Sequence, residues 1–161
     1  MDKAEKTKNR NLGYEKMKRL TVLAALIFLI VMLTACGQTG PNQTSVPKQV
    51  EVNGGSYWNI TAAELMSMLE KNDFLLVNVH IPYEGEIPPT DLFVPYNEVE
   101  QYLRQFPPDK TAKIVLYCRS GSMSATAAKT LVKQGFTNVW NLEGGMVDWE
   151  KQGYKLVRQS K

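Results

Sequence analysis

Residues 114–124 read IVLYCRSGSMS, and the pattern of this segment changes from apolar to small and polar at Cys118. Its first four residues are apolar, as expected of a short strand buried on both faces of a sheet. Cys118 follows directly, and small or polar residues then lead into a segment with three alanines that ends before Gly135, a helix stop signal. The stretch therefore predicts a strand, a tight loop that starts with a thiol, and a helix packed closely on the sheet.

The same alternation of strands and helices continues on both sides of this loop. Thr61 and Glu64 form a capping box, which predicts a helix start. Further strands are expected at residues 74–79 and 139–142, a strand or arm at 57–60, and helices at 61–70, 97–106 and 146–152. This order predicts an α/β fold with a mostly parallel central sheet flanked by helices.

The position of the thiol indicates chemistry. A cysteine at the carboxyl end of a buried strand lies in the crevice where α/β proteins bind ligands. The backbone N–H groups of the loop and the positive end of the following helix favour the thiolate, which is the nucleophilic form. Cys118 is therefore the candidate catalytic residue, and the alternative is an inert, buried cysteine.

The net charge of +3 does not predict a nucleic-acid partner, because the basic residues are unevenly distributed. Seven of the 19 Lys and Arg residues lie within the first 19 positions, and the rest of the chain is close to neutral. The chain has two cysteines and one histidine. A disulfide scaffold is excluded by this count, no zinc site can be assembled, and we expect neither a metal nor a cofactor.

The N-terminal region has the layout of a secretory signal. Residues 20–33 (LTVLAALIFLIVML) carry no charge and follow a basic segment. This run is shorter than the roughly 20 apolar residues that a membrane-spanning helix needs. It ends in Leu33-Thr34-Ala35-Cys36, which resembles the bacterial lipobox. The resemblance implies cleavage before Cys36 and attachment of a lipid to its thiol; an uncleaved signal anchor is the alternative.

These observations predict three parts of the chain. Residues 1–35 are expected to be a signal peptide with a lipobox, although Met17 is an alternative translation start. Residues 36–55 are rich in Gly, Pro, Ser, Thr, Asn and Gln and are expected to form a flexible tether. Residues 56–158 are expected to fold as the domain. The chain would then be lipid-anchored at the extracytoplasmic face of a bacterial cell membrane.

The motifs of the domain, taken together, resemble the rhodanese-like domain family of sulfurtransferases. The loop Cys118–Ser124 is similar to the active-site loop of the family. The resemblance also rests on three shorter motifs, which are Leu76-Val77-Asn78-Val79, Gly85-Glu86-Ile87-Pro88 and Asn141-Leu142-Glu143-Gly144-Gly145-Met146 with Trp149. Their order and spacing are more specific than any one of them.

The resemblance implies a two-step transfer of sulfane sulfur. Cys118 would take sulfur from a small donor such as thiosulfate, a persulfide or a polysulfide and would pass it to a thiol or cyanide. The residues implied to bind the substrate are Arg119, Ser120, Gly121, Ser122, Met123 and Ser124. Arg119 could instead be a solvated charge, and the serines could be turn formers and a helix cap. A membrane-anchored persulfide carrier that docks with a protein sulfur acceptor is the alternative function.

Three positions depart from the pattern of the family. Asn78 and His80 stand where the family usually has Asp and Arg, so that ion pair is missing. Met123 stands where thiosulfate-using members often have a basic residue. Met123 could disfavour thiosulfate and offer a soft apolar surface to a persulfide, or it could only pack under the loop.

Other thiol chemistries fit the sequence less well. Cysteine phosphatases need an arginine six positions after the nucleophile, and that position is Ser124. A Cys/His protease would need His80 as its base. We expect His80 to be a polar surface residue, and residues 83, 84 and 86 to belong to a solvated loop near the site.

Overall fold

The computed structural model describes residues 46–158. The predicted signal peptide, the predicted lipid-attachment residue Cys36 and the first half of the predicted tether lie outside the described residues. Among residues 46–158, no helix has the length and apolar character needed to cross a membrane.

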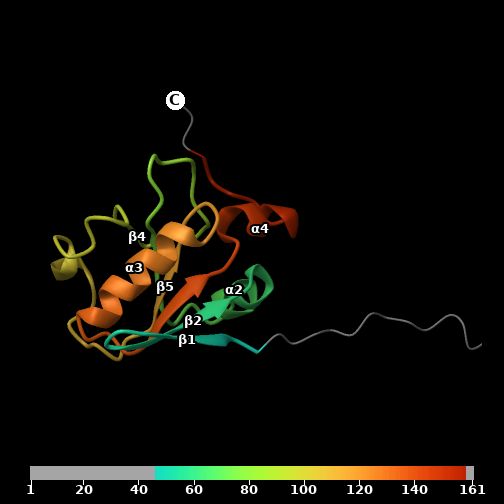
Figure 1. The fold of residues 1–161 in the computed structure, drawn as a ribbon. Helices are drawn as coiled ribbons and strands as arrows, with labels where there is room; N and C mark the ends of the chain where they lie inside the picture. The colour runs from blue at the N-terminus through green and yellow to red at the C-terminus, as the bar shows by residue number, and fades with distance from the viewer. Residues whose placement is uncertain (1–45, 159–161) are drawn as a thin grey trace, which may run out of the picture. The chain divides into compact units, whose positions relative to one another are not determined.

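The domain is built around one six-stranded sheet (Figure 1). Its strands are β1 (Lys48–Val52), β2 (Gly55–Ile60), β3 (Leu75–Asn78), β4 (Leu92–Phe93), β5 (Ile114–Tyr117) and β6 (Val139–Leu142). Its helices are α2 (Ala62–Leu69), the 3-10 helix η1 (Leu103–Gln105), α3 (Ser122–Lys133) and α4 (Gly145–Lys151). The strand order is β1-β2-β6-β5-β3-β4, and all pairs are parallel except β1 with β2. The predicted α/β fold with a mostly parallel sheet is confirmed.

Two apolar layers cover the two faces of the sheet. On one face, α3 packs through Ala127, Ala128 and Leu131 against residues that include Leu116 and Cys118. On the other face, α2 and α4 pack against a second cluster that includes Tyr117. Figure 1 shows α3 separated from α2 and α4 by the strands. The sheet is thus buried on both faces around β5, as its four apolar residues predict.

The predicted helix start at Thr61 is confirmed. The backbone N–H of Glu64 donates to Thr61 Oγ1 at 3.3 Å, and the backbone N–H of Thr61 donates to Glu64 Oε2 at 2.7 Å. These two bonds satisfy donors that a helix end leaves without intrahelical partners.

The predicted tether is wrong for its last residues, because Lys48–Val52 forms β1. This strand pairs with β2 in an antiparallel hairpin whose register joins Val52 to Gly55 across Asn53 and Gly54. An Asn-Gly pair is a strong signal for a two-residue hairpin turn, and Gly54 has the positive φ that such a turn needs, 98°. Val50 and Val52 pack against the core, so the folded domain begins before residue 56.

The helix predicted at residues 97–106 is also wrong. The segment forms successive turns and the short helix η1. Its backbone N–H groups donate to carbonyl oxygens three residues earlier, as Gln101 does to Glu98 and Gln105 to Tyr102. The buried side chains of Val94, Val99 and Phe106 join the cluster under α3. Packing of these three residues on the sheet outweighs the local helix signal.

Candidate active site

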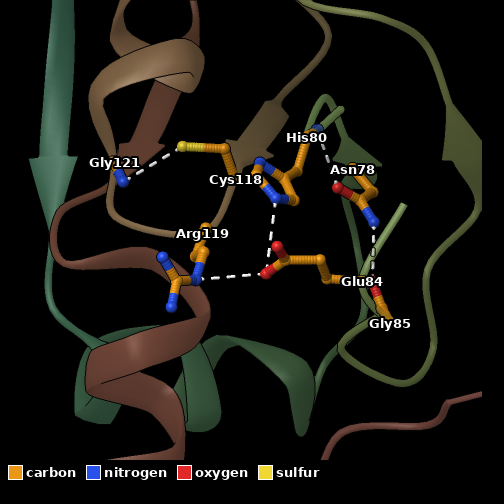
Figure 2. A network of polar contacts seen from close by, with 7 residues as sticks. All are labelled: Asn78, His80, Glu84, Gly85, Cys118, Arg119 and Gly121. Carbon is orange, nitrogen blue, oxygen red and sulfur yellow. Dashed lines mark hydrogen bonds and ion pairs between the residues drawn. The ribbon is translucent and has the colours of Figure 1, made fainter. Parts of the chain in front are cut away.

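Cys118 lies at the carboxyl end of the central strand β5, with β6 on one side and β3 on the other. Its side chain is buried, with 1% of the residue exposed. The backbone N–H of Gly121 donates a hydrogen bond to Cys118 Sγ at 3.1 Å (Figure 2). The Ser124 hydroxyl lies 3.5 Å from the same sulfur. A sulfur anion would therefore meet two donors from its own loop.

The loop turns sharply at Gly121 and runs into α3. Gly121 has a φ of 90°, a left-handed conformation, and α3 begins at the next residue. The Ser124 hydroxyl also lies 3.1 Å from Gly121 O, so its single proton can serve either the carbonyl or the sulfur. Negative charge on the sulfur would draw this proton towards it.

The remaining residues of the predicted binding loop have different surroundings. Arg119, Ser120 and Ser122 are exposed. Met123 is half-buried and packs against the cluster that contains Cys118. The structure thus brings Gly121 and Ser124 to the sulfur and leaves three polar side chains of the loop at the surface.

The amino end of α4 is hydrogen-bonded to the backbone of the thiol loop. The backbone N–H groups of Met146 and Val147 donate to the carbonyl oxygens of Cys118 at 2.9 Å and Arg119 at 3.0 Å. A Cβ atom at Gly145 would lie 2.3 Å from the carbonyl oxygen of Cys118, and Gly145 has a φ of 55°. Only glycine allows this approach, so the Gly-Gly pair has a packing role that its sequence signal as a turn does not reveal.

The segment after β3 is tied to the sheet by two buried polar side chains. Asn78 accepts from the backbone N–H of His80 at 3.0 Å and donates through Nδ2 to Gly85 O at 3.0 Å. The Tyr117 hydroxyl accepts from the backbone N–H of Ile87 at 3.0 Å, and burial raises the pKa of Tyr117, which keeps the phenol neutral. These bonds hold the loop beside the thiol.

His80 is buried, with 5% of the residue exposed, so the prediction that it lies at the surface is wrong. Its Nε2 lies 3.5 Å from Glu84 Oε2, and the same carboxylate oxygen lies 3.1 Å from Arg119 Nε. Figure 2 shows Glu84 between the two basic side chains. The sequence did not predict this contact, because the loop that brings residue 84 to residue 119 is held by long-range bonds. These are the bonds of Asn78 and Tyr117 and the backbone bonds between Glu86 and Val157.

A cleft of about 140 Å³ opens beside the loop. Among the residues that line it are Glu84, Arg119, Met146, Glu150, Leu156 and Arg158. Backbone bonds of 2.8 Å in both directions between Glu86 and Val157 place the C-terminal segment along this cleft. Within residues 46–158, no group of three or more His, Cys, Asp or Glu side chains is arranged to hold a metal ion.

Comparison with known proteins agrees with this geometry. The family model for the rhodanese-like domain matches residues 61–152. A sulfurtransferase from Allochromatium vinosum is 34% identical over 93 residues, which cover 56% of this chain and 84% of that protein. The rhodanese-related protein of Thermoplasma volcanium has a TM-score of 0.54 at 27% identity, and the match covers 63% of this chain and 98% of that one.

A second relative is much longer than this chain. The tRNA uridine(34) hydroxylase of Escherichia coli is 29% identical over 108 residues, which cover 62% of this chain and 30% of that enzyme. The matched residues of the family model run from the N-cap of α2 past the end of α4 and include the whole thiol loop. These relatives support a sulfurtransferase-type role, and the match over more than half of its residues shows that the chain belongs to the rhodanese-like domain family.

Proposed function

We propose that the protein is a sulfurtransferase that carries sulfane sulfur on Cys118 as a persulfide. The observation that carries this proposal is the buried Cys118 sulfur with the Gly121 N–H directed at it at 3.1 Å. The start of α3, four residues after Cys118, would stabilise a sulfur anion, because the amino end of a helix presents unpaired N–H groups. The 34% identical sulfurtransferase supports the same reading.

With thiosulfate as donor, the Cys118 thiolate attacks the outer sulfur. A new bond forms between Cys118 Sγ and that sulfur, and the sulfur–sulfur bond of thiosulfate breaks. Its electron pair leaves with sulfite, so three negative charges on the reactants become three on the products. In the second step an acceptor thiol takes the outer sulfur, becomes a persulfide and returns Cys118 to the thiolate.

With a persulfide as donor, the thiolate attacks the terminal sulfur and the donor's own thiolate leaves. Met123 supports this choice of donor, because no positive charge stands at that position and its thioether is soft and polarisable. The structure also gives Met123 a packing role, since it contacts the cluster around Cys118. Donor choice at this position therefore has to be measured with both donors.

A persulfide carrier that docks with a protein acceptor is the second candidate. Tyr83 and Phe93 favour it, because both aromatic side chains are exposed, at 38% and 39%. Their rings meet edge to face, with 5.8 Å between the ring centroids. Tyr83 belongs to the same loop as Glu84. Exposed aromatic side chains of this kind are frequent in protein–protein interfaces.

The two candidates differ in turnover. The first requires steady release of sulfite from thiosulfate, or of thiol from a persulfide, with a small thiol or cyanide as acceptor. The second requires a stable persulfide that is delivered only to a partner protein.

We also propose that the chain acts at the extracytoplasmic face of a bacterial membrane, attached through a lipid on Cys36; the lipobox motif supports this location.

The test of the mechanism is Cys118→Ser. The wild-type domain should gain the mass of one sulfur atom after exposure to thiosulfate or glutathione persulfide, and the variant should gain none, because a hydroxyl is a far poorer nucleophile. Ser67→Ala is the control, since Ser67 is an exposed hydroxyl on α2, outside the thiol loop. Sulfur transfer by a folded Cys118→Ser protein would refute the proposal.

A further inference from the structure

His80 is a buried basic side chain that the proposed sulfur transfer does not use. It is the single histidine of the chain, and 5% of the residue is exposed. Both ring nitrogens are buried and make no hydrogen bond within the described residues. A buried polar group without a hydrogen bond costs free energy, so its presence calls for a physical reason.

One charged group contacts the imidazole. Its Nε2 lies 3.5 Å from Glu84 Oε2, and Arg119 Nε lies 3.1 Å from the same oxygen. The carboxylate is therefore shared by a histidine and an arginine. With a neutral imidazole, the charges of Glu84 and Arg119 offset each other. With a protonated imidazole, the three side chains together carry one net positive charge.

This cluster lies beside the thiol loop. The backbone N–H of Val79 donates to Tyr117 O at 2.9 Å, which continues the pairing of β3 with β5 past the ends of both strands. His80 and Cys118 are the next residues on these two neighbouring segments, so their Cα atoms are about 6 Å apart. Figure 2 shows the imidazole between Cys118 and Glu84. A charge on the ring therefore acts on the sulfur through space, without a direct contact.

Histidine is the side chain that ordinarily gains or loses a proton between about pH 5 and 8. The other ionisable groups on the elements around this loop each have a partner or stay neutral. They are Tyr117 with its raised pKa, Glu86 bonded to Tyr83, Asp91 bonded to the N–H of Leu76, and Glu150 paired with Arg158. All of them are unchanged in a variant that lacks only the imidazole, so a comparison of the two proteins isolates its charge.

We propose that His80 is a positioning residue that acts through the Glu84–Arg119 pair and adds a positive charge beside the thiol loop when it takes up a proton. The added charge favours the anionic form of the Cys118 sulfur. This inference rests on the proposed function for the role of the thiol and adds its response to pH. It predicts that Cys118 keeps part of its reactivity in mildly acidic solution.

The first measurement follows alkylation of Cys118 by iodoacetamide in the full chain, read from the mass of the peptide that contains this residue. The reagent is neutral, so its own attraction to the cluster does not depend on pH. Wild type is compared with His80→Gln, which keeps an amide donor but cannot ionise, between about pH 5.5 and 8.5. The ratio of the two rates should rise about fivefold on acidification, as expected for one charge roughly 9 Å from the sulfur at an effective dielectric constant of about 40.

Glu84→Gln tests the same cluster with the imidazole in place. Without the carboxylate, Arg119 is unpaired and a buried imidazolium is disfavoured, so the net charge stays positive over the whole pH range. The ratio of wild type to this variant should also rise about fivefold on acidification, and the ratio of the two variants to each other should not change with pH. Glu51→Gln is the control and should match wild type at every pH, because Glu51 is exposed on β1, the edge strand away from β5.

A ratio of wild type to His80→Gln that is constant with pH overturns the inference, because a purely structural role would change the rate equally at every pH. If His80→Gln does not fold, a constant ratio for Glu84→Gln overturns it instead. The second measurement repeats the pH series with thiosulfate and with glutathione persulfide and follows the gain of sulfur on Cys118. A pH-dependent alkylation ratio without sulfur gain from either donor supports the role of His80 and overturns the proposed function.

Discussion

Gly145→Ala tests whether α4 positions the thiol loop. A Cβ at this residue would lie 2.3 Å from the carbonyl oxygen of Cys118 and 2.8 Å from that of Arg119. Neither atom can move aside as a side chain could, because both belong to the backbone of the loop. The methyl group must therefore push the end of α4 away from the loop.

The expected loss of stability has two parts. An alanine in a left-handed conformation, here with a φ of 55°, costs about 1–2 kcal/mol. The bonds from the N–H groups of Met146 and Val147 to the loop carbonyls are lengthened or broken, at about 1 kcal/mol each. The free energy of unfolding should then fall by about 3–4 kcal/mol, which is a large share of the roughly 5–15 kcal/mol of a typical domain.

The rate of sulfur transfer should fall further than stability alone explains. A displacement of about 1 Å at a reacting group can cost about 100-fold in rate. Stability is measured by urea unfolding, and the rate by the appearance of the persulfide mass on Cys118, at a temperature where the variant is folded.

Gly153→Ala provides a matched control. Gly153 also has a positive φ, 84°, but a Cβ there would meet no heavy atom within 4 Å. It should lose only about 1–2 kcal/mol of stability and keep its rate. If the two variants lose the same stability and both keep the wild-type rate, then α4 does not position the thiol by close contact and the reasoning is refuted.

Three further changes test other parts of the molecule. Tyr117→Phe should lower the free energy of unfolding by about 1–3 kcal/mol, because the buried N–H of Ile87 loses its acceptor; an unchanged urea midpoint would contradict this. Met123→Arg should raise kcat/KM for thiosulfate roughly tenfold, equivalent to about 1.4 kcal/mol, without a matching gain for glutathione persulfide. An unchanged ratio of the two donors in a folded protein would show that residue 123 only packs. Cys36→Ala should leave activity unchanged and either block processing or release the chain from membranes; a shortened variant that still fractionates with membranes would exclude the lipid anchor.

Local signals in the sequence were sufficient for much of the fold. The apolar run of β5, the capping box at Thr61 and the stop at Gly135 each act over a few residues, and the structure has a strand or a helix boundary at each. The thiol follows β5 directly, so its place at a strand end was also predictable. The Asn-Gly turn at residue 53 was an equally local signal, but the polar composition around it concealed β1.

The surroundings of the thiol loop could not be predicted from the sequence. The contact of Glu84 with Arg119 joins two different strand connections, and the bonds of Asn78 and Tyr117 help to hold the loop that carries Glu84. The close approach of Gly145 to the carbonyl oxygen of Cys118 joins residues 27 positions apart in sequence. The Gly-Gly pair at 144–145 by itself predicts a turn and not this contact. Such contacts depend on how the chain closes over distance, so short-range periodicity and capping contain no information about them.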